Sequence, residues 1–199
     1  SFLWPTEQLR KGVFMTLLEA VNTCLRALGE TPVTSVDEQY PTLATILPAL
    51  DEAVQALLTE GWWFNSFPGY TLLPELDGTV LVPNEMLVFY PDDPSRFTFS
   101  GRRIVDTATG SIAVNSSVVG RAVLLYDFTE LAEAAQWAVT YKAAYDVYVA
   151  DFGVDNTAQK LQADFAGYYR ELGAMHTRQR RASSATKRQT LRWKQKLRN

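Results

Sequence analysis

The chain has 199 residues, of which 47% are hydrophobic and 21% are charged, a composition typical of one globular domain or of a domain with a large insertion. This composition excludes intrinsic disorder for most of the chain. A chain of this length buries about 70% of the surface that its unfolded form exposes, so it needs neither a disulfide nor a metal to hold a core. One cysteine, Cys24, and one histidine, His176, are too few for a tetrahedral zinc site or a Cys/His nucleophile pair within one subunit.

No run of about 18 apolar residues occurs in the sequence, so we expect no membrane span. Residues 1–14 lack the continuous apolar stretch and the small-residue cleavage site of a signal peptide. We therefore expect the protein to be made in the cytoplasm.

Charge is distributed very unevenly along the chain. All 22 acidic residues lie at or before Glu171 together with 10 of the 19 basic residues, which gives this part a net charge of -12. The segment 178–199 has no acidic residue and nine basic ones: Arg178, Arg180, Arg181, Lys187, Arg188, Arg192, Lys194, Lys196 and Arg198. Because like charges repel, we expect this tail to be mobile until it meets an acidic partner. Its apolar residues Leu191, Trp193 and Leu197 favour a docking segment over a merely solvated tail.

Two helices are predicted before residue 62. The first begins at Thr16, which forms a Thr-x-x-Glu capping box with Glu19, and it ends at Gly29. The second spans roughly residues 42–60, where leucine, isoleucine and valine recur at three or four residues. Pro48 falls inside this pattern, and it indicates either a kink or a later helix start.

An antiparallel sheet is predicted for the middle of the chain. Seven short apolar or alternating runs are separated by turn residues: 70–73, 80–82, 86–90, 96–99, 103–105, 112–114 and 122–126. These runs lie too close together along the chain for the crossover helices that parallel strands require.

Two further helices are predicted after the sheet, one capped by Thr129 and ending at Gly153, the other opening at Asn156. The fold class is therefore α+β, with a four-helix bundle-like part, an antiparallel β insertion between the second and third helices, and a basic C-terminal tail. We expect an N-terminal extension (1–15), a helical domain (16–61 and 129–182), a β insertion domain (62–128) and a docking tail (183–199).

The junction between the helical part and the sheet is predicted to be aromatic. Gly61 ends a helix, and Trp62, Trp63 and Phe64 follow at once, so these rings are expected to pin the helices to the sheet. Asn65 is expected to satisfy backbone groups in this turn. A core role for both tryptophans is favoured over a stacking platform for sugars or bases, although adjacent extended residues point to opposite faces, which leaves one of them as a candidate subunit contact.

The sequence offers little for catalysis, because it has no glycine-rich phosphate loop, HExxH or GxSxG motif. The clustered carboxylates fall in proline-containing turns, where acidic residues are common for turn geometry alone: Glu75, Asp77, Asp92 and Asp93. We interpret Cys24 as a core residue and His176 as an exposed residue near the C-terminal end of its helix. No catalytic, cofactor or metal site is therefore expected.

Five motifs occur in a fixed order along the chain: AVNTCLRALGETPV (20–33), GWWFN (61–65), TLLPE (71–75), VPNEML (82–87) and AAQWAVTYKAAY (134–145). Over roughly residues 15–176 the chain resembles the tail tubular protein A family of T7-like short-tailed bacteriophages. The resemblance implies a structural head-to-tail adaptor in the virion tail, assembled as a dodecameric ring between the portal protein and the tail nozzle of tail tubular protein B, with tail fibres nearby. It also implies a channel through which double-stranded DNA passes without specific binding.

Three hypotheses for function remain at this point. In the first, an adaptor ring, the basic residues of 178–198 with Leu191, Trp193 and Leu197 dock on the portal protein. In the second, the same tail binds nucleic acid, with basic groups on phosphates and Trp193 stacked on a base. The third, a carbohydrate-active tail enzyme that uses the turn carboxylates and the Trp62–Trp63 pair, has the least support.

Overall fold

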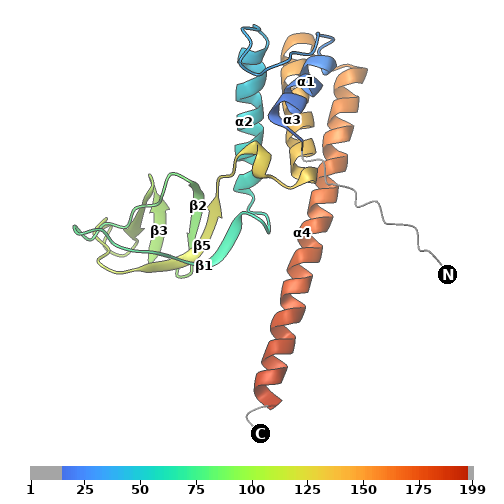
Figure 1. Ribbon diagram of the computed structural model, residues 1–199. Helices are drawn as coiled ribbons and strands as arrows, with labels where there is room; N and C mark the ends of the chain where they lie inside the picture. Colours follow the sequence, from blue (N-terminus) through green and yellow to red (C-terminus); the bar gives the residue numbers. More distant parts are fainter. Residues whose placement is uncertain (1–14, 197–199) are drawn as a thin grey trace, which may run out of the picture.

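The computed structural model describes the backbone of residues 15–196 and the side chains of residues 15–181. Four helices and five strands follow one another along the chain, which confirms the α+β class (Figure 1). Their bounds are α1 Leu17–Ala27, α2 Leu43–Thr59, β1 Ser66–Leu72, β2 Met86–Pro91, β3 Phe97–Ser100, β4 Arg103–Asp106, β5 Val118–Leu124, a 3-10 turn Phe128–Glu130, α3 Glu133–Phe152 and α4 Asn156–Lys196. Among the described residues, no helix has the length and apolarity needed to cross a bilayer.

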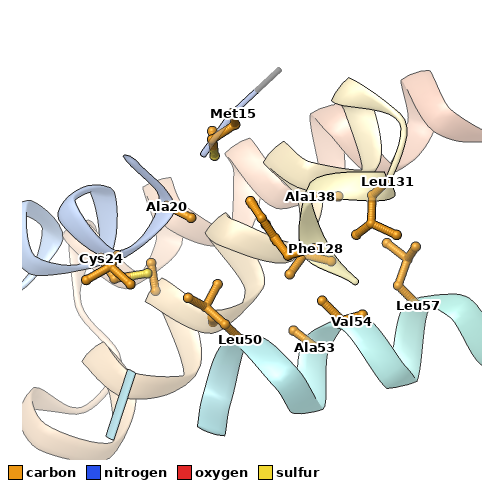
Figure 2. Close-up of a cluster of buried hydrophobic side chains, with 14 of the residues drawn as sticks. Met15, Ala20, Cys24, Leu50, Ala53, Val54, Leu57, Phe128, Leu131 and Ala138 are labelled. Atoms are coloured by element: carbon orange, nitrogen blue, oxygen red, sulfur yellow. The ribbon is translucent and has the colours of Figure 1, made fainter. Parts of the chain in front are cut away.

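Helix α3 is the centre of the helical part, and α1, α2 and α4 each pack against it. Its sequence explains this position, because alanines occupy most of its buried positions and allow close approach of neighbouring helices on several sides. The core between the helices is formed by side chains from all of these elements (Figure 2). Figure 2 shows Leu50, Val54 and Leu57 of α2 facing Phe128 and Leu131, which lie just before α3.

The starts of the helices are set by local capping. Thr16 and Glu19 form the predicted capping box of α1, in which the Glu19 backbone N–H donates to Thr16 Oγ1 at 3.2 Å and the Thr16 N–H donates to Glu19 Oε2 at 2.7 Å. In α2, the helix begins at Leu43 and continues through Pro48, so the later start is wrong.

The predicted cap of the third helix is wrong by a few residues, whereas the fourth helix begins at Asn156 as predicted. Thr129 lies in the 3-10 turn, which Asp127 and Glu130 close with a capping box of their own, and α3 begins only at Glu133. The cap of α4 is Asp155, whose Oδ1 accepts the Ala158 N–H at 2.9 Å. At α4 an aspartate carboxylate takes the capping role, because it combines an acceptor with a charge that favours a helix N-terminus.

The sheet part contains a three-stranded antiparallel sheet in the order β1-β5-β2 and a separate β3-β4 hairpin. Two of the seven predicted runs, 80–82 and 112–114, form only the isolated bridges Leu81↔Arg103 and Thr79↔Ala113. Their backbone pairing is too short for a strand, although Val80 and Val82 are buried. A second, smaller core fills this part, formed by Leu72, Val80, Val82, Met86, Phe89, Phe97, Ile104, Val118 and Ala122.

Helix α4 continues well beyond the other helices. Figure 1 shows the sheet part beside the lower end of α2, while the orange-to-red α4 runs the length of the bundle and then projects past it. Its 41 residues correspond to a rod of about 60 Å. The sequence predicted a mobile tail here, whereas the backbone of residues 178–196 continues α4 as a helix, because the segment has no glycine or proline to end it.

Candidate assembly site at the helix–sheet junction

Asn65 is the polar centre of the junction. It is fully buried, and its Oδ1 accepts the Trp62 backbone N–H at 2.8 Å. Its Nδ2 donates to two carbonyl oxygens, Leu58 O at the end of α2 and Leu124 O at the end of β5, both at 2.9 Å. The amide of Asn65 therefore hydrogen-bonds to the end of α2, to the turn after Gly61 and to the last residue of the central strand β5.

The three aromatic residues before Asn65 have different environments. Trp62 is buried, donates from Nε1 to Leu57 O at 2.7 Å, and meets Tyr169 of α4 edge-on with ring centroids 5.7 Å apart. Trp63 and Phe64 are half-buried and contact each other edge-on at 5.0 Å. Trp62 thus joins α2 to α4, whereas Trp63 keeps part of its ring at the surface.

His176 lies in this junction rather than at an exposed helix end, so its interpretation as a residue near a helix C-terminus is wrong. The helix continues for 20 residues beyond it. Its Nδ1 accepts the Trp63 backbone N–H at 3.1 Å, and its ring meets Trp62 edge-on at 5.5 Å. Burial, and then the positive charge of Arg180, lower the pKa of His176 below its usual value. The neutral ring required by this hydrogen bond is therefore favoured.

A second contact between α4 and α2 lies one to two turns before His176. The Tyr169 hydroxyl donates to Glu60 Oε2 at 2.5 Å, and this hydrogen bond, followed by burial, raises the pKa of Tyr169 to about 12. Together with Trp62 and His176, this pair fixes the direction in which α4 leaves the bundle. The sequence pattern gave no sign of this pair.

Beyond His176 the first basic side chains of the segment 178–199 are exposed: Arg178, Arg180 and Arg181. The predicted docking residues Lys187, Arg188, Leu191, Arg192, Trp193, Lys194 and Lys196 follow on the same helix, with side chains outside the described residues, and Leu197 and Arg198 lie outside the described backbone. The geometry therefore separates the two groups of predicted site residues. The aromatic junction is internal, whereas the basic residues lie on a helix that has left the bundle.

Asp77 and Asp93 stabilise the turns in which they lie. Asp77 Oδ1 accepts the Thr79 N–H at 2.9 Å, and Asp93 Oδ1 accepts the Ser95 hydroxyl at 2.5 Å; these side-chain and backbone hydrogen bonds lower the pKa of both aspartates. Cys24 is buried in the helical core, and burial raises the pKa of its thiol to about 12. Among the described side chains, no group of three His, Cys, Asp or Glu residues is placed to hold a metal ion.

Gln136 is a structural residue that the pattern did not reveal. It is fully buried on α3, where its Oε1 accepts the Met15 N–H at 3.0 Å and its Nε2 donates to Phe128 O at 3.0 Å. The only sequence signal was a polar residue within the alanine-rich run of α3. This glutamine fixes where the chain enters the helical core and where it leaves the sheet.

Comparison with known proteins agrees with this arrangement. The sequence model of a family described as "Tail tubular protein" matches residues 18–182. The chain is also 30% identical over 173 residues to "Tail tubular protein A" of Klebsiella phage KP34, an alignment that covers 86% of this chain and 92% of that protein. The family match ends at residue 182 of α4, so it includes the bundle, the sheet part and the start of the projecting helix. The resemblance predicted from the motifs is thereby confirmed, and the chain belongs to the tail tubular protein family, a structural protein of the bacteriophage tail and not an enzyme.

Proposed function

We propose that this chain is the repeating subunit of a head-to-tail adaptor ring, which connects the portal protein to the tail nozzle and lines the channel through which DNA leaves the head. The observation that carries the proposal is the projecting part of α4. The helix continues for 20 residues past His176, which contacts the junction, and it projects beyond the other helices (Figure 1). In a family of tail proteins, such a helix is suited to dock on the next component of the tail.

The composition of the projecting segment supports docking on a protein. Charge alone gives a salt-sensitive and unspecific attachment, whereas a buried aromatic residue adds specificity. We assign the portal-docking role mainly to residues 187–198, which contain Leu191, Trp193 and Leu197 among the basic residues. Because the backbone is already helical to Lys196, docking does not bear the full entropic cost of ordering this segment.

The charge of the remaining chain supports a channel. Residues 1–177 have a net charge of -12, and a ring of such subunits presents a predominantly acidic surface. A negative lumen lets a polyanion slide, whereas a basic lumen holds it by releasing its counterions. The subunits of such a ring use heterologous contacts, in which one side of a subunit meets the opposite side of its neighbour.

Electron microscopy of the purified protein, alone and with its portal protein, tests this function. The expected result is a closed ring of twelve subunits seated on one face of the portal, with a central opening wide enough for duplex DNA. A filament, or a protein that does not bind the portal at micromolar concentration, would contradict the proposal.

One observation favours a second function, nucleic-acid binding, because Arg178, Arg180 and Arg181 are exposed on a helix that continues through the basic segment to Lys196. Counterion release predicts that binding to DNA phosphates weakens steeply with salt. A salt titration with random-sequence duplex DNA separates the two functions. An adaptor shows weak binding that is lost at physiological salt, whereas a DNA-binding protein retains measurable affinity and a steep logarithmic slope.

A further inference from the structure

Two exposed leucines mark the end of the sheet part that lies farthest from the bundle. Leu73 and Leu76 follow β1, and Leu76 is fully exposed. Their turn is well ordered by hydrogen bonds: Gly78 N–H donates to Glu75 O at 3.0 Å, and Glu75 N–H donates to Thr79 O at 2.7 Å. Large apolar side chains held on a fixed, exposed turn are typical of an interaction surface.

The topology brings two acidic turns to this same end. β1 and β2 both run antiparallel to β5, so the residues that follow them meet at the start of β5. The Asp92 N–H donates to Val119 O at 3.0 Å, and the Asn115 N–H donates to Gly78 O at 3.0 Å. Glu75, Asp77, Asp92 and Asp93 therefore lie at the same end of the sheet as Leu73 and Leu76, and we call this end the distal tip.

The distal tip is negatively charged overall. Its residues lie within 27–95, a stretch of 69 residues that contains 11 acidic residues and no lysine or arginine. Arg96 lies near Asp93, but the hydrogen bond from Ser95 lowers the pKa of Asp93 more than this arginine does. Arg103 lies near Asp77, whose pKa is lowered mainly by the hydrogen bonds from Thr79. Among the described side chains, the one ion pair within 4 Å is Lys142–Asp146, far along the chain from this surface.

The complementary charge lies on α4. The last acidic residue of the helix is Glu171, and the side chains of Arg178 and Arg181 are exposed just beyond the junction. Arginine offers aliphatic stems for a leucine as well as a guanidinium for a carboxylate. In Figure 1, the sheet part extends to the left, away from the bundle, whereas the projecting part of α4 runs downward from it, so the two elements diverge.

We infer that the distal tip of one subunit binds the base of the projecting helix, around Arg178 and Arg181, of the next subunit in the ring. The occupant is a second copy of this chain because the two surfaces are opposite in charge and lie on elements that diverge from the bundle. A contact between two different surfaces of identical subunits is heterologous, and it closes into a ring when the rotation permits. The inference rests on the proposed ring and adds the surfaces that hold neighbouring subunits together.

Charge reversal tests the contact. Glu75 and Asp92 are suitable positions because no hydrogen bond of their side chains holds the turns. We expect Glu75→Lys with Asp92→Lys to reduce ring assembly on the portal at least about tenfold, and Arg178→Glu with Arg181→Glu to do the same. The chain with all four changes restores the opposite charges and is expected to assemble to within about threefold of the unchanged protein. Normal assembly of both double variants, or no recovery in the fourfold variant, would overturn the contact.

A cross-link provides a direct second measurement. A chain with Leu76→Cys and Arg181→Cys, treated with a short bismaleimide when assembled, is expected to give a ladder of covalent oligomers, while each single variant gives no ladder. Absence of the ladder in rings visible by electron microscopy would overturn the contact and leave the adaptor function intact. If the unchanged protein forms no ring on the portal, the adaptor function itself fails, so the two failures are distinguishable.

Discussion

Single residues at the junction determine how the two parts of the molecule are joined. Asn65 connects α2, the turn and β5 by three hydrogen bonds, and Trp62 supplies a buried ring between α2 and α4. Phe64 is only half-buried, so we expect the free energy of unfolding to depend less on Phe64 than on Trp62.

The Asn65→Ala variant is expected to lose about 3 kcal/mol or more of unfolding free energy. The Trp62 N–H and the Leu124 carbonyl then lose this partner, and each costs about 1–3 kcal/mol, partly relieved by water, whereas Leu58 O still accepts the Gly61 N–H. Trp62→Ala is expected to cost about 3–5 kcal/mol, and Phe64→Ala clearly less. Urea denaturation measures these values, with Gln55→Ala on the exposed side of α2 as the control. A stable Trp62→Ala protein that no longer assembles would place this ring in a subunit contact.

The single histidine gives the protein a defined pH dependence. The pKa of His176 is lower in the folded protein than in the unfolded chain, so the unfolded chain binds more protons below pH 6.5. The contribution of His176 to the free energy of unfolding is therefore fully present above about pH 6.5. It decreases as the pH falls from 6.5 toward the pKa of His176 in the folded protein. Thermal unfolding between pH 7.5 and 5.5 is expected to show this decline, and His176→Asn, whose amide oxygen matches the position of Nδ1 that accepts the Trp63 N–H, is expected to lose it. An unchanged slope in that variant would assign the titration to other groups.

Two glycines, Gly120 in a strand and Gly173 in a helix, have opposite effects on the stability of their elements. Gly120 lies in the central strand β5, where an added Cβ would be 2.4 Å from Tyr90 O and 2.9 Å from the Pro91 Cα. Gly173 lies in α4 with no atom within 4 Å of its ideal Cβ. The first glycine is required by the close approach of two strands, whereas the second only weakens a helix.

Replacing each glycine by alanine is expected to change stability with opposite sign. Gly120→Ala forces backbone atoms apart and is expected to destabilise the protein by about 1–3 kcal/mol or more. Gly173→Ala is expected to stabilise it by about 0.5–1 kcal/mol through helix propensity. Both are measured by urea denaturation under the same conditions. If Gly120→Ala is neutral, β5 and β2 do not approach as closely as described.

At the scale of the whole molecule, we propose that two parts of the chain, the distal tip and the projecting part of α4, bind other subunits or the portal. We expect the isolated protein to be a monomer or weak oligomer at micromolar concentration, because its acidic subunits repel one another, and to form rings mainly on the portal. Sedimentation velocity with and without portal measures this. A stable closed ring in the absence of portal would contradict the need for a template.

Removal of residues 183–199 is expected to leave the fold intact, because this segment lies beyond both the junction and the family match. Portal binding is expected to fall strongly, and Trp193→Ala alone is expected to weaken it about 30-fold, as for a central aromatic anchor. Gln195→Ala on the same helix is the control, and circular dichroism verifies the fold. Full occupancy of the portal by the truncated protein would show that the segment has another role.

The sequence by itself determined the elements whose causes are local. The α+β class, the Thr16–Glu19 box and the ends of helices at Gly29, Gly61 and Gly153 follow from periodicity, capping residues and glycine, which act over a few positions. Five of the seven predicted runs form strands, and these too follow from local periodicity and turn residues. The order of the five motifs also identified the family.

Only the tertiary structure decided what depends on contacts between distant residues. The environment of His176 is set by Trp62 and Trp63, more than 110 positions away, and Gln136 is bound to Met15 across 121 positions. The distal tip exists because β1 and β2 share β5 as a neighbour, a pairing that no local pattern encodes. The helical tail was missed because its repelling charges were weighed above the continuous helix that precedes it, which removes the cost of nucleation. Local propensity sets where helices and strands begin and end, whereas long-range packing sets which side chains become a site.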